Sequence, residues 1–349
     1  MKSDDRRLKI LETVVDEYIR TGEPVGSKTI ATMFGNSVSS ATIRNDMATL
    51  EKLGFLEQPH ASAGRVPTYL GYRMYISNLM HPRELTEEEK EQIDEMIGKD
   101  NLTASTVLDN ALEALAELTG CAVVNASDLP KFSVITRVEV VPAGKRLYAL
   151  LMITSAGEVR NKICRLEFDL SNEQLEYFEN LLNQQLLGLR VEDFSPSVMQ
   201  QLSAAMGSYM LSLSPLLYAA YELSDEISRR HVDIKGETNL LRCGDFDAGE
   251  LMRFMSAKNE IDKILTSAFD GINIVFGKET DKFAITNSSM ILTKYGMGET
   301  MGSLGIIGPI RLDYAKIIPY IEYFSQSVSR MIDDMIEDRK KGELTDGKR

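Results

Sequence analysis

The sequence predicts an α+β protein that begins with a winged helix-turn-helix, and three observations lead to this class. Three helical patterns followed by two short extended stretches occupy residues 1–80. A run of β-rich segments separated by turns covers residues 133–168, and β-rich segments return after residue 270. A helical block lies between them. Strands and helices are therefore segregated along the chain, unlike the regular alternation of a doubly wound sheet.

Helical patterns account for the start of the chain. The first helix begins near Ser3, has apolar residues at helical spacing and ends at Gly22. A short helix follows at 28–34, and a turn separates it from a third helix whose cap is Ser39 or Ser40. Two short helices joined by a tight turn form a helix-turn-helix.

The segment after the third helix predicts a wing. Extended stretches at 55–58 and 65–68 flank a loop that contains Gly64, which is the pattern of a β-hairpin. We expect Arg65 at the tip of this wing, where it could contact a phosphate or enter a minor groove. His60 lies in the same loop, either as an exposed histidine or as a phosphate contact.

The third helix has a polar outer face suited to a DNA groove. With Ile43, Met47 and Leu50 set toward the core, Asn45 and Lys52 point away from it. Asparagine can pair with an adenine edge and arginine with a guanine edge. A structural or protein-binding winged helix is the alternative. The DNA contacts that we expect come from eight residues: Lys28, Ser39, Ser40, Thr42, Arg44, Asn45, Lys52 and Arg65.

The net charge permits a nucleic-acid partner once it is divided along the chain. The whole chain carries −13, from 39 basic and 52 acidic side chains. Residues 1–80 hold ten basic and nine acidic side chains, which gives +1 and leaves −14 for the rest. Because phosphate contacts supply most nonspecific affinity, one winged helix should bind weakly and need a second copy on the same duplex.

Several motifs closely resemble the family of the heat-inducible transcription repressor HrcA. In the winged helix they are PVGS at 24–27, SSATIRNDM at 39–47 and SAGRVPT at 62–68. Later in the chain they are GETNLL at 236–241 and GSLGIIGP at 302–309. The resemblance covers nearly the whole chain, and its winged-helix motif is specific.

This resemblance implies a repressor that binds an inverted-repeat operator, the CIRCE element, as a homodimer upstream of chaperone operons. It also implies dependence on a GroE-type chaperonin, and an architecture of winged helix, GAF-like domain and inserted dimerising segment. We therefore place the winged helix at 1–80 and a linker helix at 81–101. The GAF-like domain takes 102–170 and 270–340, and a mainly helical insert takes 171–269.

Two segments outside the winged helix leave alternatives open. Residues 206–221 are rich in Met, Leu and Tyr, more so than a one-faced surface helix requires. Such an excess often marks a subunit interface, although an intrachain core explains it equally well. The acidic run of the linker helix is most simply a solvated face, although negative charge near DNA would also help to orient the winged helix toward the phosphates.

No motif for catalysis, metal binding or cofactor binding stands out. The three cysteines lie 43 and 79 residues apart, and neither they nor the three histidines have metal-ligand spacing. The GxxGxxG pattern at 302–308 lacks the Gly-Lys-Ser/Thr of a phosphate loop. Ile310 and Leu312 stand where the family pattern has Thr and Met, which makes a catalytic loop still less expected. We expect no enzyme, no cofactor and no metal.

The interpretation that best fits these features is a dimeric repressor of heat-shock chaperone operons, released on heating or when chaperonin is occupied. The alternative is a winged-helix regulator gated by a small molecule bound in the GAF-like domain. No apolar run approaches the ~18 residues that cross a bilayer, and no secretory signal opens the chain. We therefore expect a cytoplasmic protein without a membrane partner.

Overall fold

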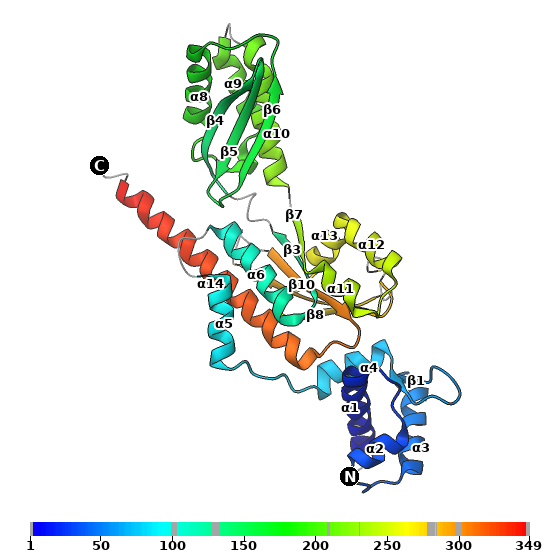
Figure 1. Cartoon of the computed structure of the whole chain (residues 1–349). Coiled ribbons are helices and arrows are strands. Elements are labelled where there is room, and N and C mark those ends of the chain that lie inside the picture. The colour runs from blue at the N-terminus through cyan, green and yellow to red at the C-terminus, as the bar shows by residue number, and fades with distance from the viewer. Residues whose placement is uncertain are drawn as a thin grey trace.

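The computed structural model describes residues 3–98, 103–127, 133–207, 210–229, 231–277, 283, 285–296 and 302–346. The chain forms three bodies in space (Figure 1): a winged helix, a central sheet covered by helices, and a smaller sheet unit at the opposite end. The α+β class and the N-terminal winged helix-turn-helix are confirmed. Within these ranges, no helix has the length and apolar character that crossing a membrane requires.

The winged helix is built as its sequence pattern predicts. Ser39 is the residue that caps the third helix, because its hydroxyl accepts a hydrogen bond from the Thr42 amide at 3.1 Å. The two wing strands pair antiparallel, with Leu56 opposite Pro67. The elements are α1 (Ser3–Thr21), α2 (Ser27–Met33), α3 (Ser40–Lys52), β1 (Leu56–Glu57), β2 (Val66–Pro67), α4 (Tyr69–Met74) and a π-helical turn (Tyr75–Leu79).

The central body is an antiparallel sheet in the order β7-β3-β10-β9-β8. Its strands are β3 (Ala122–Ser127), β7 (His231–Lys235), β8 (Asn273–Phe276), β9 (Ser288–Tyr295) and β10 (Gly302–Pro309). One face is covered by α5 (Glu87–Ile97), α6 (Ala104–Thr119) and α14 (Tyr314–Asp346), the other by α11 (Glu237–Cys243), α12 (Ala248–Ser256) and α13 (Lys258–Thr266).

Alternating side chains give this sheet two separate cores. On β3, Val123 belongs to the cluster under α6 and α14, whereas Val124 belongs to the cluster under α13. This is the period of two expected for a strand that is buried on both faces. The cluster that contains Val123 continues without a break into the core of the winged helix.

The smaller unit has a sheet and a core of its own. Its strands β4 (Ile135–Gly144), β5 (Leu147–Thr154) and β6 (Val159–Arg165) pair antiparallel in sequence order. Three helices cover one face of this sheet: α8 (Asn172–Leu186), α9 (Pro196–Met206) and α10 (Met210–Ser228). A short 3-10 helix lies at Val191–Asp193.

The domain boundaries differ from the expectation at two places. We expected 102–170 to share a domain with 270–340, but β4, β5 and β6 form a sheet separate from β9 and β10. We expected 171–269 to be the insert, but β7 and α11 to α13 pack with the central sheet. The interrupting unit therefore spans 133–229 and contains strands as well as helices. A meander pairs with itself, so its sequence pattern says nothing about which other strands it joins.

Packing distinguishes the alternatives for the apolar segment, and the linker helix has exposed acidic side chains at Glu87, Glu88 and Glu91. In residues 206–221, Leu213, Leu216 and Leu217 are buried in the core of the smaller unit, so an intrachain core accounts for the apolar excess. In the linker helix α5, Ile93 and Ile97 are fully buried. That helix is packed against α14 as part of the central body and is not a free connection.

The GxxGxxG pattern has a packing explanation. A Cβ on Gly302 would lie 2.3 Å from the Tyr295 ring, and Cβ atoms on Gly305 and Gly308 would lie within 3 Å of leucine side chains. The close approach at Gly302 lets the Tyr295 hydroxyl cross β10 and donate to Asn125 Oδ1 at 2.7 Å. These glycines permit tight packing within the sheet rather than a phosphate cradle.

Candidate nucleic-acid interface

Helix α3 presents the face that its periodicity predicts. Ile43 and Leu50 are buried against the helices beneath, whereas Arg44, Asn45 and Lys52 are exposed. The orientation of the helix is therefore confirmed. Ser39 and Thr42 bond to each other through their hydroxyls as well as through the cap. They begin the helix and leave the polar side chains that follow free to reach outward.

Ion pairing separates the basic residues of the winged helix into two groups. Three of them, Lys28, Arg44 and Lys52, have no carboxylate within 4.0 Å among the residues that the structure describes. The other described basic residues are engaged: Arg6 and Arg7 with Asp46, Lys9 with Glu12, Arg20 with Glu17, Arg65 with Glu51, and Arg73 over the Phe276 ring. The free cations all belong to the residues expected to contact DNA.

The buried carboxylate of Asp46 fixes α3 on α1. Its Oδ2 lies 2.7 Å from Arg6 Nε and its Oδ1 lies 3.4 Å from Arg7 Nε, and only 6% of the side chain is exposed. The hydrogen bond from Arg6 to this carboxylate raises the pKa of Arg6. This pair was not predicted from the sequence. The signal was present, because Asp46 lies between inward-facing positions and a buried carboxylate requires a cationic partner.

Arg65 lies at the base of the wing, which corrects its expected place at the tip. Its backbone exchanges two hydrogen bonds of 2.9 Å with Val25. Its Nη2 lies 2.8 Å from Glu51 Oε2, and 16% of its side chain is exposed. The reason is the preceding Gly64, where a Cβ would lie 2.4 Å from the Val25 carbonyl, so the chain already packs closely against the segment before α2 there. The tip is the turn at 60–63, closed by a bond from the Ala63 amide to the His60 carbonyl.

The cysteines do not supply a reactive group. Burial raises the pKa of Cys121 to about 12. Burial, with a further contribution from Asp245, raises the pKa of Cys243 to about 11. Both side chains are therefore neutral thiols near neutral pH, which are poor nucleophiles and poor metal ligands. In the part of the chain that the structure describes, His, Cys, Asp and Glu side chains form no group of three that could hold a metal ion.

Comparison with known proteins gives the same family in both halves of the chain. A model described as "Winged helix-turn-helix transcription repressor, HrcA DNA-binding" matches residues 4–79, and one described as "HrcA protein C terminal domain" matches residues 105–318.

Full-length relatives carry one name. The heat-inducible transcription repressor HrcA of Acetivibrio thermocellus is 34% identical over 341 residues, which cover 95% of this chain and 97% of the relative. The protein of that name from Brevibacillus brevis is 30% identical over 339 residues, with 95% and 99% covered. A crystal structure described as a hypothetical protein at 2.2 Å resolution is similar with a TM-score of 0.66 and 25% identity, and the match covers 95% of this chain and 99% of that one.

Proposed function

Because the chain belongs to the HrcA family of heat-inducible transcription repressors, we propose that it represses chaperone operons by binding an inverted-repeat, CIRCE-type operator as a homodimer. The observation that carries the proposal is the unpaired positive charge on the outer side of the helix-turn-helix. Lys28, Arg44 and Lys52 are exposed, and no carboxylate of the described residues pairs with them; Asn45 beside them is exposed as well. A basic side chain without an ion pair inside the protein can contact a phosphate or a base edge without first breaking such a pair.

The proposed contacts divide by role. Arg44 and Asn45, in the N-terminal half of α3, read base edges in the major groove. Lys28 and Lys52 contact phosphates on either side, and Ser40 adds a hydroxyl at the start of α3. Ser39 and Thr42 lie at the same helix end, where backbone amides face a phosphate. We assign Arg65 the task of holding the wing against α3, since a direct phosphate contact would require breaking its pair with Glu51.

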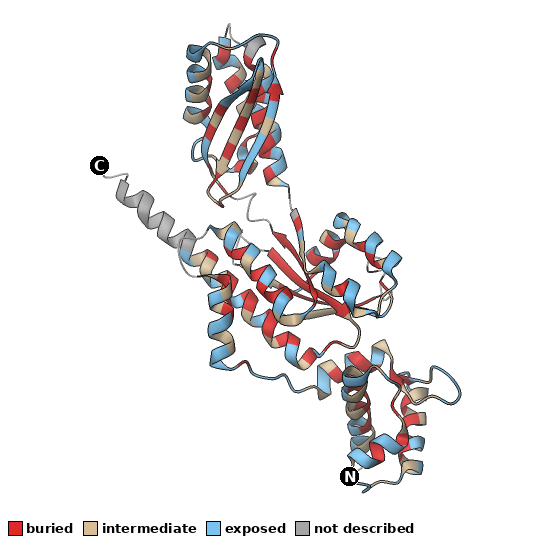
Figure 2. Cartoon of the chain, in the orientation of Figure 1, coloured by how far each residue is buried: buried red, intermediate tan, exposed pale blue. Residues whose placement is uncertain are grey.

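The homodimer is proposed to form through the outer face of the β4-β5-β6 sheet. The inner face packs on α8 and α10. On the outer face Val141, Val159 and Ile163 are 45%, 56% and 65% exposed, and Figure 2 shows exposed stretches along these strands. Strand register places Ile163 beside Ala149, and Val159 beside Ile153. The outer sheet face contains seven apolar residues: Val141, Leu147, Ala149, Leu151, Ile153, Val159 and Ile163. The strand register places Arg137, Glu139, Asn161 and Arg165 on the same face.

A second copy of the chain is the occupant that fits this face. A two-fold interface uses the same patch on both subunits, and an apolar sheet face is complementary to itself. Two copies are also what the charge requires, because a single winged helix carries about one net positive charge. Two winged helices on one duplex raise affinity without new contacts.

Release of the operator follows from coupled equilibria. Heating, or occupation of a GroE-type chaperonin by unfolded clients, lowers the population of the binding-competent dimer and vacates the operator. In this proposal the protein is cytoplasmic, has neither a cofactor nor an enzymatic activity, and has no membrane partner. Gating by a small molecule is less well supported. The sheet face under α12 and α13, where a GAF-like ligand would lie, is filled by side chains such as Leu251, Phe254 and Leu265.

Titration of duplexes with purified full-length protein tests the proposal. We expect an inverted-repeat duplex to bind more tightly than a scrambled duplex of the same composition, with affinity falling as salt rises. Arg44→Ala should remove ~1 to 3 kcal/mol of operator binding. Arg20→Ala is the matched control, since Arg20 is exposed in the same domain but paired with Glu17. Equal losses in the two variants, or equal binding of both duplexes by the unaltered protein, would contradict the proposal.

The chaperonin step needs its own measurement. We expect added chaperonin to increase the fraction of protein that binds the inverted repeat, and an excess of unfolded client to reverse the increase. Binding that is indifferent to chaperonin and client, but changes with a metabolite, would favour the small-molecule alternative.

A further inference from the structure

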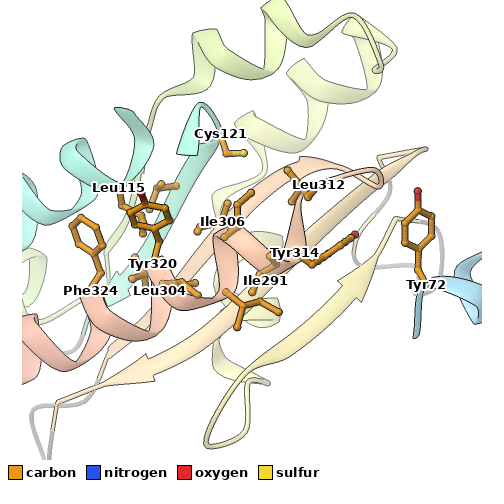
Figure 3. Packing of buried hydrophobic residues seen from close by; sticks show 14 of the residues in the cluster. Tyr72, Leu115, Cys121, Ile291, Leu304, Ile306, Leu312, Tyr314, Tyr320 and Phe324 are labelled. Atoms are coloured by element: carbon orange, nitrogen blue, oxygen red, sulfur yellow. The ribbon is translucent and has the colours of Figure 1, made fainter. Parts of the chain in front are cut away.

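An aromatic contact joins the winged helix to the central body. Tyr72, on α4, lies 6.1 Å from Phe276 of β8 and 6.0 Å from Tyr314 at the start of α14, measured between ring centroids. Tyr69 stacks on the same Phe276 ring at 5.7 Å. Figure 3 shows Tyr314 pointing from the central body toward Tyr72 across the boundary.

The aromatic rings of this contact are buried and not exposed at the surface. Tyr72, Phe276 and Tyr314 are all 0% exposed and belong to one continuous buried cluster. A second point of contact lies beside it, where Arg311 Nε is 3.6 Å from the position a Cβ on Gly22 would occupy. Arg73 of α4 also lies over the Phe276 ring, with Cζ 5.4 Å from the ring centroid. The chain itself joins the two bodies through the short segment 80–86. The aromatic contact therefore sets the direction in which α3 faces relative to the central body.

The hydroxyls of Tyr314 and Tyr72 differ in their hydrogen bonding. The Tyr314 hydroxyl donates to the Ile310 carbonyl at 2.7 Å. The Tyr72 hydroxyl is buried and has no hydrogen-bond partner among the described residues. Burial raises the pKa of both groups, so both remain protonated at any physiological pH. A buried hydroxyl without a partner opposes the packing that its ring favours.

We propose that Tyr72 is a positioning residue for operator binding: its ring docks the winged helix so that α3 faces the duplex, and its unpaired hydroxyl keeps this docking readily reversible. The inference rests on the proposed dimeric operator binding. An undocked winged helix stays tethered by residues 80–86 and keeps its own contact surface. It therefore binds a half-site as before, but it loses most of the advantage of two linked modules on one duplex.

Loss of a hydroxyl at each tyrosine gives a matched pair of tests. Tyr72→Phe removes an unpaired group and should favour docking by about tenfold. Tyr314→Phe removes a hydroxyl whose hydrogen bond to Ile310 lies within the central body, so it should leave docking unchanged and serves as the control. We expect Tyr72→Phe to raise the affinity of the full-length protein for a duplex with two half-sites, and Tyr314→Phe to leave that affinity as it is. Both variants should bind a duplex with one half-site as the unaltered protein does.

Hydrogen exchange without DNA measures the docking itself. Amides of α4 and of residues 80–86 should exchange more slowly in Tyr72→Phe and at an unchanged rate in Tyr314→Phe. Altered exchange with no binding of any inverted repeat would refute the proposed function while leaving the docking contact in place. Unaltered exchange in Tyr72→Phe, equal effects on one-site and two-site duplexes, or the same affinity gain in Tyr314→Phe would overturn the role of Tyr72.

Discussion

The guanidinium of Arg65 and the carboxylate of Glu51 join the wing to α3, with Nη2 2.8 Å and Nε 3.1 Å from the same oxygen, Oε2. Glu51 lies near the end of α3, and Arg65 lies where β2 begins. The pair therefore determines how far the wing stands from the recognition helix. It also neutralises a cation that would otherwise face the duplex.

The Arg65–Glu51 pair predicts coupled effects on operator affinity. Arg65→Ala and Glu51→Ala should each weaken binding by about fivefold, because either change releases the wing, and partly exposed pairs contribute ~1 kcal/mol or less. The double variant should be no weaker than either single variant, since both changes break the same interaction. Duplex titrations of the three variants measure this cycle. Tighter binding by Glu51→Ala would mean that Arg65 is a phosphate contact restrained by Glu51, and would contradict its positioning role.

Asn45 and Lys28 should affect binding in different ways. Asn45→Ala removes a side chain proposed to read a base edge, so it should cost ~1 to 3 kcal/mol on the preferred duplex and relax specificity at one position. Lys28→Ala removes a proposed phosphate contact, so it should weaken all duplexes alike and reduce the salt slope by about one. Titrations over a set of single-base variants at several salt concentrations separate the two patterns. If Asn45→Ala weakened binding to all duplexes alike, Asn45 would not be a residue that reads a base edge in the groove.

The sequence predicts elements whose pattern is local. The cap at Ser39, the apolar face of α3 and the antiparallel order of β4, β5 and β6 all arise from residues close together in the chain, and the structure has them. Which sheet a strand joins depends on residues far away in the chain. The short strand β7 was not predicted, because five residues that pair with the distant β3 carry too little pattern of their own.

The candidate site shows the same division. Exposure of Arg44 and Asn45 follows from helical periodicity, which the sequence contains. The place of Arg65 depends on the contact between Gly64 and Val25, about forty residues apart in the chain, which no spacing rule reveals. The contact between Tyr72 and Phe276 is further out of reach, because it joins two domains that fold around separate local patterns.

Gly302 should tolerate no side chain. A Cβ there would lie 2.3 Å from the Tyr295 hydroxyl and displace the bond from that hydroxyl to Asn125, so Gly302→Ala should destabilise the protein by about 1 to 3 kcal/mol or more. Gly26→Ala is the control, since its Cβ would meet only Thr29 Oγ1 at 3.8 Å. Thermal unfolding measures both. A stable Gly302→Ala variant, or stabilisation of the unaltered protein by nucleotides, would restore the phosphate-loop interpretation.

Acid should loosen the linker helix α5 through Glu89. The backbone amide of Thr86, followed by Arg83, lowers the pKa of Glu89 from 4.5 to about 2. A carboxylate whose pKa falls on folding stabilises the fold above its unfolded pKa, and this stabilisation is lost as pH falls through the folded value. Amides of α5 should therefore lose protection between pH 4.5 and about 2. Glu89→Gln should lack this transition, and the same acid sensitivity in that variant would assign the transition to another group.

A charged residue introduced on the outer sheet face should weaken the proposed dimer. Ile163 is 65% exposed on the edge strand β6, and a two-fold interface would bury it twice, so Ile163→Glu places two carboxylates in one contact. The dimer dissociation constant should rise by about tenfold or more, as measured by analytical ultracentrifugation. Phe269→Glu is the matched control, because Phe269 is 76% exposed but lies outside this face. The isolated Ile163→Glu subunit should keep its fold, as judged by circular dichroism, and bind one half-site normally. A dimer lost with Phe269→Glu and kept with Ile163→Glu would move the interface from the smaller unit to the central body.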